Sequence, residues 1–175
     1  MTILITGGSK CGKSGIGERI LSAFRGRKFY IATMMPYGGE AGAIIDRHRK
    51  MREGKGFETI ERYTAPGGLA LPEGCGAMLE CVGNLCANEM FVAHSPDPCG
   101  EIIRGIAHLA EKAELLVIIT NQVDCDGIDY PPETASYMRN MGVIHSALAG
   151  MSDCVIESVC GIPVPLKGGL PECLL

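Results

Sequence analysis

The most constraining feature of the sequence is a glycine-rich segment close to its start. Residues 7–14 are Gly-Gly-Ser-Lys-Cys-Gly-Lys-Ser, which satisfies the pattern G-x-x-x-x-G-K-[ST]. An apolar run over 3–6 precedes this segment, and apolar residues at helical spacing follow it over 14–24. A strand, a glycine-rich turn and a helix in this order form a phosphate-binding loop, and the context disfavours a chance glycine-rich turn.

Such a loop points successive backbone N–H groups into one concavity at a helix N-terminus, where they bind phosphate oxygens. We expect Lys13 to place its positive charge on the β- and γ-phosphates, and the Ser14 hydroxyl to ligate Mg²⁺. The chain is therefore predicted to bind a nucleoside triphosphate. The expected nucleotide-binding residues of the loop are Gly7, Gly8, Ser9, Lys10, Cys11, Gly12, Lys13 and Ser14.

The remaining sequence alternates apolar runs, helical stretches and breakers, a pattern typical of α/β proteins. It predicts strands at 3–6, 28–33, 77–82, 115–120, 154–160 and 162–166, and helices at 14–24, 40–52, 101–113 and 134–149. The stretches 62–76 and 88–100 are rich in glycine, proline and polar residues and are predicted to be loops. We expect one domain over residues 1–175, with a mainly parallel sheet flanked by helices and 162–166 as an antiparallel edge strand.

Charge and composition argue against several classes of protein. A net charge of −4 argues against a protein that coats nucleic acid or an anionic membrane. No apolar run approaches the roughly 18–20 residues that cross a bilayer, and the N-terminus lacks the features of a signal peptide. The nine cysteines contain no C-x-x-C pair, so a zinc or thioredoxin-like site has no support. A cytoplasmic protein with reduced thiols is the expectation.

The loop alone does not define the reaction, because ATPases, GTPases, kinases and nucleotidyltransferases share it. A GTPase would need Asn-Lys-x-Asp after a strand, whereas residues 121–124 are Asn-Gln-Val-Asp. This difference disfavours a regulatory GTPase.

A second candidate lies in the basic segment 46–52, Asp-Arg-His-Arg-Lys-Met-Arg. One interpretation is a solvated basic helix face with His48 partly packed. The other is that His48 attacks an α-phosphate, while the neighbouring cations hold the triphosphate and keep the imidazole neutral. Periodicity alone favours the first. The other histidines are weaker candidates: His145 is expected to be packed, His108 lies off its apolar stripe, and His94 is in a predicted loop.

The order and spacing of several short segments indicate a protein family more specifically than the loop does. These are the start of the chain through the loop, Tyr-Ile-Ala-Thr at 30–33, Ile-Asp-Arg-His-Arg at 45–49, Leu-Glu-Cys-Val at 79–82 with Asn88 following, Thr-Asn-Gln-Val at 120–123, and Gly-Ile-Pro-Val-Pro-Leu-Lys at 161–167. Over nearly the whole chain, they resemble the bifunctional adenosylcobinamide kinases/adenosylcobinamide-phosphate guanylyltransferases of cobalamin biosynthesis.

The resemblance implies two reactions: phosphorylation of a hydroxyl on the aminopropanol arm of adenosylcobinamide, and transfer of GMP from GTP to that phosphate through a guanylyl-histidine. It implies that His48 is the nucleophile, that Lys13 stabilises the charge on the phosphates, and that Glu80 holds Mg²⁺ or a water on it. The alternative for Glu80 is a capping carboxylate. It also implies a homo-oligomer, specifically a trimer, and both GTP and ATP as substrates. The further nucleotide contacts that it implies are Thr33, Met34, Met35, Arg52, Glu53, Gly54, Lys55 and Glu61.

Two departures from the family pattern bear on the kinase step. The family commonly carries a glutamate where this chain has Gln122, and an Asn-Gln pair where this chain has His145 and Ser146. Nucleotide binding and guanylylation therefore carry over more directly than the kinase step. The alternatives are a divergent small-metabolite kinase with one activity, in which His48 acts only electrostatically, and a non-catalytic nucleotide-binding relative.

Overall fold

The computed structural model describes residues 1–36, 54–123 and 127–175. Its centre is a seven-stranded sheet in the order β3-β2-β4-β5-β1-β6-β7. The strands are β1 (Thr2–Thr6), β2 (Lys28–Ala32), β3 (Phe57–Glu61), β4 (Cys75–Leu79), β5 (Ala113–Ile119), β6 (Cys154–Val159) and β7 (Ile162–Lys167). All neighbouring strands are parallel except β7, which pairs antiparallel with β6. The predicted α/β fold and its antiparallel edge are confirmed.

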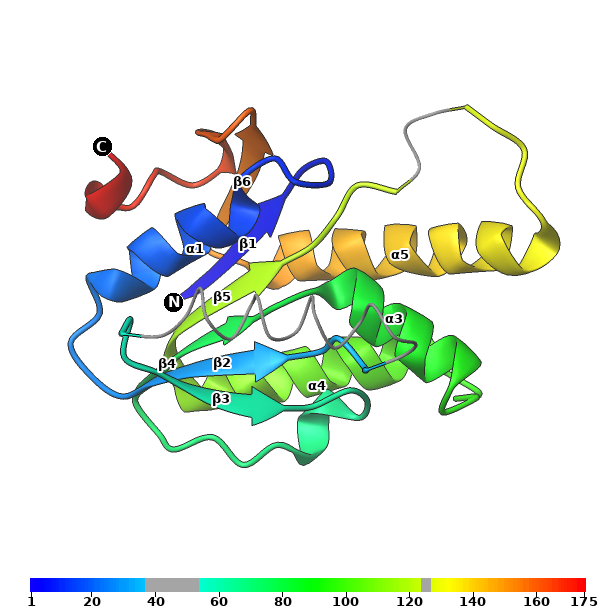
Figure 1. Cartoon of the computed structure of the whole chain (residues 1–175), viewed down its shortest axis with the longest axis horizontal. Coiled ribbons are helices and arrows are strands. Elements are labelled where there is room, and N and C mark those ends of the chain that lie inside the picture. The colour runs from blue at the N-terminus through cyan, green and yellow to red at the C-terminus, as the bar shows by residue number, and fades with distance from the viewer. Residues whose placement is uncertain (37–53, 124–126) are drawn as a thin grey trace.

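Helices cover both faces of this sheet (Figure 1). The α-helices of the described residues are α1 (Lys13–Ser22), α3 (Val82–Phe91), α4 (Pro98–Lys112) and α5 (Pro132–Met151), and two short 3₁₀ turns are η1 (Pro66–Gly68) and η2 (Glu172–Leu174). Because side chains alternate along a strand, each strand supplies both faces. Ile3 and Ile5 pack with α1, whereas Leu4 packs with α3, α4 and α5.

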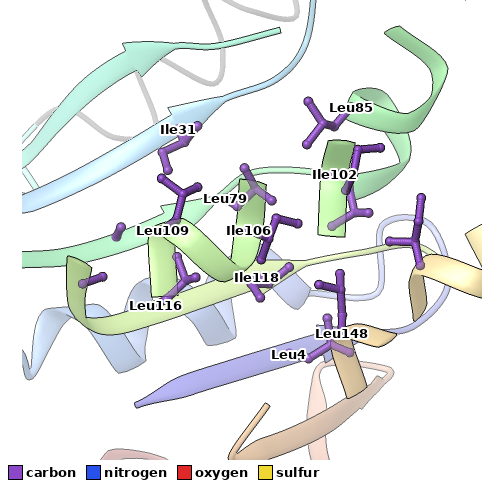
Figure 2. Close-up of a cluster of buried hydrophobic side chains, with 14 of the residues drawn as sticks. Leu4, Ile31, Leu79, Leu85, Ile102, Ile106, Leu109, Leu116, Ile118 and Leu148 are labelled. Carbon is purple, nitrogen blue, oxygen red and sulfur yellow. The ribbon is translucent and has the colours of Figure 1, made fainter. Parts of the chain in front are cut away.

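The larger core lies between the sheet and α3, α4 and α5 (Figure 2). Ile102, Ile106 and Leu109 of α4 recur at helical spacing and are fully buried against Leu116 and Ile118 of β5. Burying a side chain of this size contributes about 1.5–3 kcal/mol. This packing fixes the carboxyl ends of β4 and β5, where the candidate site lies.

One strand and one α-helix of the described residues were not predicted from the sequence. The strand β3 was missed because it is an edge strand with mostly exposed side chains, so it carries no buried apolar run. The helix α3 was missed because it is rich in glycine and asparagine, which are poor helix formers. The predicted strand at 77–82 was therefore wrong at its end, where Val82 begins α3. The predicted loop at 88–100 was wrong at both ends, which are helical.

Other predicted boundaries differ by one to three residues, and the loop predicted at 62–76 also contains η1 and the start of β4. The predicted helix at 40–52 lies outside the described residues. Within the described ranges, no helix combines the length and apolar character that spanning a membrane requires.

The described thiols range from exposed to buried, with Cys11, Cys81 and Cys99 between the two. Cys160 and Cys173 are exposed, whereas Cys75, Cys86 and Cys154 are buried. Burial raises the pKa of the Cys86 thiol to about 12, so little reactive thiolate forms there. We expect a brief maleimide treatment of the native protein at mildly alkaline pH to modify Cys160 and Cys173 first, and Cys86 only after unfolding. Peptide mass spectrometry measures this order, and equal rates at Cys86 and Cys160 would contradict the packing.

Candidate active site at the carboxyl edge of the sheet

The predicted phosphate-binding loop joins β1 to α1, as the sequence indicated. Gly7 has φ +139° and Gly12 has φ +94°, backbone conformations that residues with a side chain rarely adopt. A Cβ on Gly7 would lie 2.7 Å from the Ser158 carbonyl oxygen, and the Ser158 hydroxyl donates to the Cys11 carbonyl at 2.6 Å. The end of β6 therefore packs closely against the loop and fixes its curvature.

Lys13 begins α1 and lies beneath the loop. Its side chain is buried, and its ammonium group donates to the Gly7 carbonyl at 3.0 Å and to the Gly8 carbonyl. A buried ammonium group held by two carbonyls is a fixed positive charge, and it needs little reorganisation when an anion binds.

The N-terminus of α1 is suited to bind an anion. Gly12 precedes the helix without a side-chain cap, and no acidic residue lies in its first turn. The first N–H groups of a helix have no partner within the helix, and they carry the positive end of its dipole. Ser14 is exposed in this first turn, so its hydroxyl can reach a bound phosphate or metal ion.

Glu80 follows β4 and is buried, as expected for a residue at the end of a central strand. Its Oε1 accepts from the Tyr30 hydroxyl at 3.0 Å, and its Oε2 accepts from the backbone N–H groups of Thr33 at 3.0 Å and Met34 at 3.4 Å. The carboxylate therefore anchors the segment that leaves β2. Its predicted role toward Mg²⁺ stays a prediction, and no cluster of three potential metal ligands occurs among the residues that the structure describes.

The helix α3 holds the same segment from the other side. Asn88 is buried and donates to the carbonyls of Thr33 at 2.9 Å and Tyr63 at 3.0 Å. The Thr33 hydroxyl donates to the Cys81 carbonyl at 3.0 Å. Buried side chains thus fix the chain after β2 and after β3, although no local sequence signal revealed the role of Asn88.

The remaining described residues that were predicted to contact the nucleotide lie at two opposite edges of the sheet. Thr33, Met34 and Met35 follow β2 at the carboxyl edge, and Glu61 ends β3 there, accepting from the Tyr63 hydroxyl at 2.7 Å. Lys55 and Gly54 instead precede β3 at the opposite edge.

Lys55 forms an ion pair with Glu18 of α1 at 2.6 Å. Three residues, His48, Arg52 and Glu53, lie outside the described residues.

The segment after β5 lies next to the loop. The Gln122 N–H donates to the Gly7 carbonyl at 3.1 Å, and the Gln122 side-chain amide donates to Glu157 Oε1 at 2.9 Å. Buried Thr120 contacts His145 of α5, with 2.7 Å between Thr120 Oγ1 and His145 Nε2. The expectation that His145 is packed is confirmed, because His145 is half-buried and contacts Thr120. No pattern in the sequence pointed to Glu157.

Carboxyl ends of neighbouring parallel strands form the usual ligand crevice of an open α/β sheet. Here the ends of β1, β4 and β5 bring together an anion-binding loop, a buried lysine and polar side chains. This arrangement can bind a triphosphate and stabilise the charge that develops when a phosphoryl or nucleotidyl group is transferred.

Comparisons with known proteins agree with this geometry. The family model described as cobinamide kinase / cobinamide phosphate guanyltransferase matches residues 3–166. The bifunctional adenosylcobalamin biosynthesis protein CobP of Pseudomonas aeruginosa is 27% identical, over 96% of this chain and 98% of that protein. The bifunctional adenosylcobalamin biosynthesis protein CobU of Escherichia coli K12 is 29% identical, over 95% of this chain and all of that protein.

A solved structure of a prototypical ATPase from the type III secretion system of pathogenic bacteria has a TM-score of 0.54. It is 14% identical, and the match covers 99% of this chain and 60% of that one, so it supports the fold alone. The family match covers most of the chain, including the loop and Glu80. The chain belongs to the cobinamide kinase / cobinamide phosphate guanyltransferase family, the kinases and nucleotidyltransferases that act on a corrinoid in cobalamin biosynthesis.

Proposed function

We propose that the chain phosphorylates adenosylcobinamide and then transfers GMP from GTP to the product, with His48 as the covalent nucleophile. The observation that carries the proposal is the buried Lys13 ammonium group beneath a loop at an uncapped helix N-terminus. The family match spans the sequence from this loop through His48 to β7 and supports both reactions.

In the kinase reaction, the loop and Lys13 hold the β- and γ-phosphates of ATP or GTP. The hydroxyl oxygen on the aminopropanol arm attacks the γ-phosphorus, a new O–P bond forms, and the nucleoside diphosphate leaves. The backbone N–H groups and Lys13 stabilise the charge on the leaving diphosphate, because they are oriented before the reaction begins.

In the guanylyl transfer, a neutral His48 nitrogen attacks the α-phosphorus of GTP, and the bond to pyrophosphate breaks. A phosphate oxygen of adenosylcobinamide phosphate then attacks the same phosphorus, and the N–P bond breaks. The products are adenosylcobinamide-GDP and free His48. A covalent intermediate divides one difficult displacement into two easier ones.

The residues present fit Mg²⁺, which prefers oxygen ligands and usually binds through one or two protein groups together with phosphates. The exposed Ser14 hydroxyl would hold it directly. Glu80 would act through a water, since its oxygens already accept hydrogen bonds from Tyr30, Thr33 and Met34. When bound, the ion neutralises charge on the phosphates.

The nucleotide would extend from the loop toward the segment after β2, where Thr33, Met34 and Met35 lie. Glu80 and Asn88 hold this segment in place, which lowers the entropy cost of binding. The contacts of Arg52, Glu53, Gly54, Lys55 and Glu61 with the nucleotide remain part of the proposal, as does the trimer.

The test is to incubate the protein with Mg²⁺ and GTP labelled at the α-phosphate, followed by denaturing electrophoresis. We expect acid-labile, alkali-stable label on the wild-type protein and none on His48→Ala, because a phosphoramidate bond needs the imidazole nitrogen. His108→Ala is the matched control, since His108 lies half-exposed on α4, and this variant should label normally.

Adding adenosylcobinamide phosphate should remove the label and yield adenosylcobinamide-GDP. Labelled protein that is not discharged would show that the acceptor is a different phosphate. Wild-type protein that binds GTP but takes up no label would refute His48 as the nucleophile.

A further inference from the structure

Two polar side chains flank the first residue of the phosphate-binding loop. Glu157 lies on β6 and pairs in register with Thr6, the residue before Gly7. Gln122 follows β5, and its backbone N–H donates to the Gly7 carbonyl. The two residues therefore approach the loop from the two strands on either side of β1.

The two side chains also contact one another. The Gln122 amide nitrogen donates to Glu157 Oε1 at 2.9 Å. This hydrogen bond fixes one carboxylate oxygen, while half-buried Glu157 still reaches solvent beside exposed Gln122. The neighbouring residue Ser158 is bonded to the Cys11 carbonyl, so the backbone that carries Glu157 is held firmly against the loop.

The position of Glu157 along β6 determines on which side of the sheet its side chain lies. Along β6, Ile156 packs in the core next to α1, and Ser158 contacts the loop on that side. Strand alternation therefore places Glu157 on the opposite side of the sheet. In-line phosphoryl transfer needs the attacking oxygen opposite the leaving oxygen. Because the loop and α1 hold the leaving diphosphate, the acceptor would approach from the other side, where Glu157 lies.

Three other carboxylates among the described residues are engaged in the fold. Glu80 accepts from the backbone of Thr33 and Met34, and buried Glu89 accepts from the Ala65 N–H. The Glu61 carboxylate accepts from the Tyr63 hydroxyl at the far side of the sheet. Glu157, by contrast, is held by a single neutral amide.

We propose that Glu157 is the general base of the kinase step and that Gln122 positions its carboxylate. The inference rests on the proposed function and adds a residue to it. As the acceptor oxygen bonds to the γ-phosphorus and the bond to the leaving diphosphate breaks, the hydroxyl proton passes to Glu157. The carboxylate later releases this proton to water.

The experiment measures the two reactions separately in the full-length protein. Phosphorylation is followed with adenosylcobinamide and ATP or GTP, and GMP transfer is followed with adenosylcobinamide phosphate and GTP. We expect Glu157→Gln to lower kcat of phosphorylation about 100-fold, as general-base catalysis contributes at least this much. GMP transfer should stay within about twofold, because a phosphate acceptor carries no proton that must be removed.

Glu114→Gln is the control for the change of charge, since Glu114 is exposed at the opposite end of β5 and should leave both rates unchanged. Gln122→Leu removes the hydrogen bond to the carboxylate. It should lower kcat of phosphorylation about tenfold with the KM for the nucleotide unchanged, as expected for a positioning residue. The exchanged pair Gln122→Glu/Glu157→Gln restores a carboxylate to the same contact and should recover part of the lost kcat.

Equal phosphorylation by the wild type and Glu157→Gln would overturn the assignment and leave the proposed function intact. Equal losses in phosphorylation and GMP transfer would also overturn it, because they would indicate a structural role. If the wild type takes up guanylyl label but does not phosphorylate adenosylcobinamide, the kinase half of the proposed function fails, and Glu157 has no such role.

Discussion

Lys13→Met is expected to lower kcat/KM of both phosphorylation and guanylylation by about 10²–10³-fold. Methionine keeps most of the buried side-chain volume but removes the ammonium group from the carbonyls of Gly7 and Gly8. Loss of one preoriented donor to the phosphate charge costs an effect of this size. Both reactions should suffer, since the same loop holds the triphosphate in each.

The measurement combines steady-state rates with the rise in melting temperature that saturating GTP produces, because a ligand stabilises the state it binds. Lys13→Met should fold but lose most of this rise. Lys112→Met is the matched control, since Lys112 forms only a surface ion pair with Glu73. If Lys13→Met keeps the full rise in melting temperature with GTP and both wild-type reaction rates, Lys13 does not contact the phosphates.

The sequence predicted those parts of the site whose geometry is local. The loop over residues 7–14 is defined by its own glycines and by the strand and helix beside it, and all of these lie within about twenty residues. The buried strands and the amphipathic α4 were predicted for the same reason, because their apolar patterns report the face that packs.

The partners of Glu80 and Asn88 could not be predicted, because these contacts join distant segments. Glu80 binds the backbone of Thr33 across 47 positions, and Asn88 binds its carbonyl across 55. Neither side chain carries a local signal for its partner, and the helix that bears Asn88 is stabilised by burial rather than by propensity.

The contact that Gln122 makes could not be predicted from the sequence either. The sequence suggested a lost carboxylate at this position, because the family resemblance implies glutamate there. In the fold, the Gln122 amide contacts the carboxylate of Glu157, which lies 35 residues away. A substitution after β5 can therefore be understood only together with the residue of β6 that the fold brings into contact with it across β1.

Glu80→Gln is expected to lower the free energy of unfolding by about 3 kcal/mol and to weaken nucleotide binding. The carboxylate accepts from the Tyr30 hydroxyl and from the N–H groups of Thr33 and Met34 while buried. An amide replaces one acceptor oxygen with a donor, which leaves at least one buried donor unsatisfied, and hydrogen bonds to charged groups contribute about 1.5–3 kcal/mol each. The displaced segment would then place Thr33 wrongly for the nucleotide.

Urea unfolding and GTP titration at two Mg²⁺ concentrations distinguish anchoring from a metal role. If Glu80 anchors the segment after β2, Glu80→Gln loses stability even without nucleotide, and extra Mg²⁺ does not restore binding. Glu114→Gln, with the same change in an exposed position, should unfold as the wild type does. Unchanged stability together with binding that recovers at high Mg²⁺ would instead assign Glu80 to the metal, because mass action then compensates for a weakened ligand.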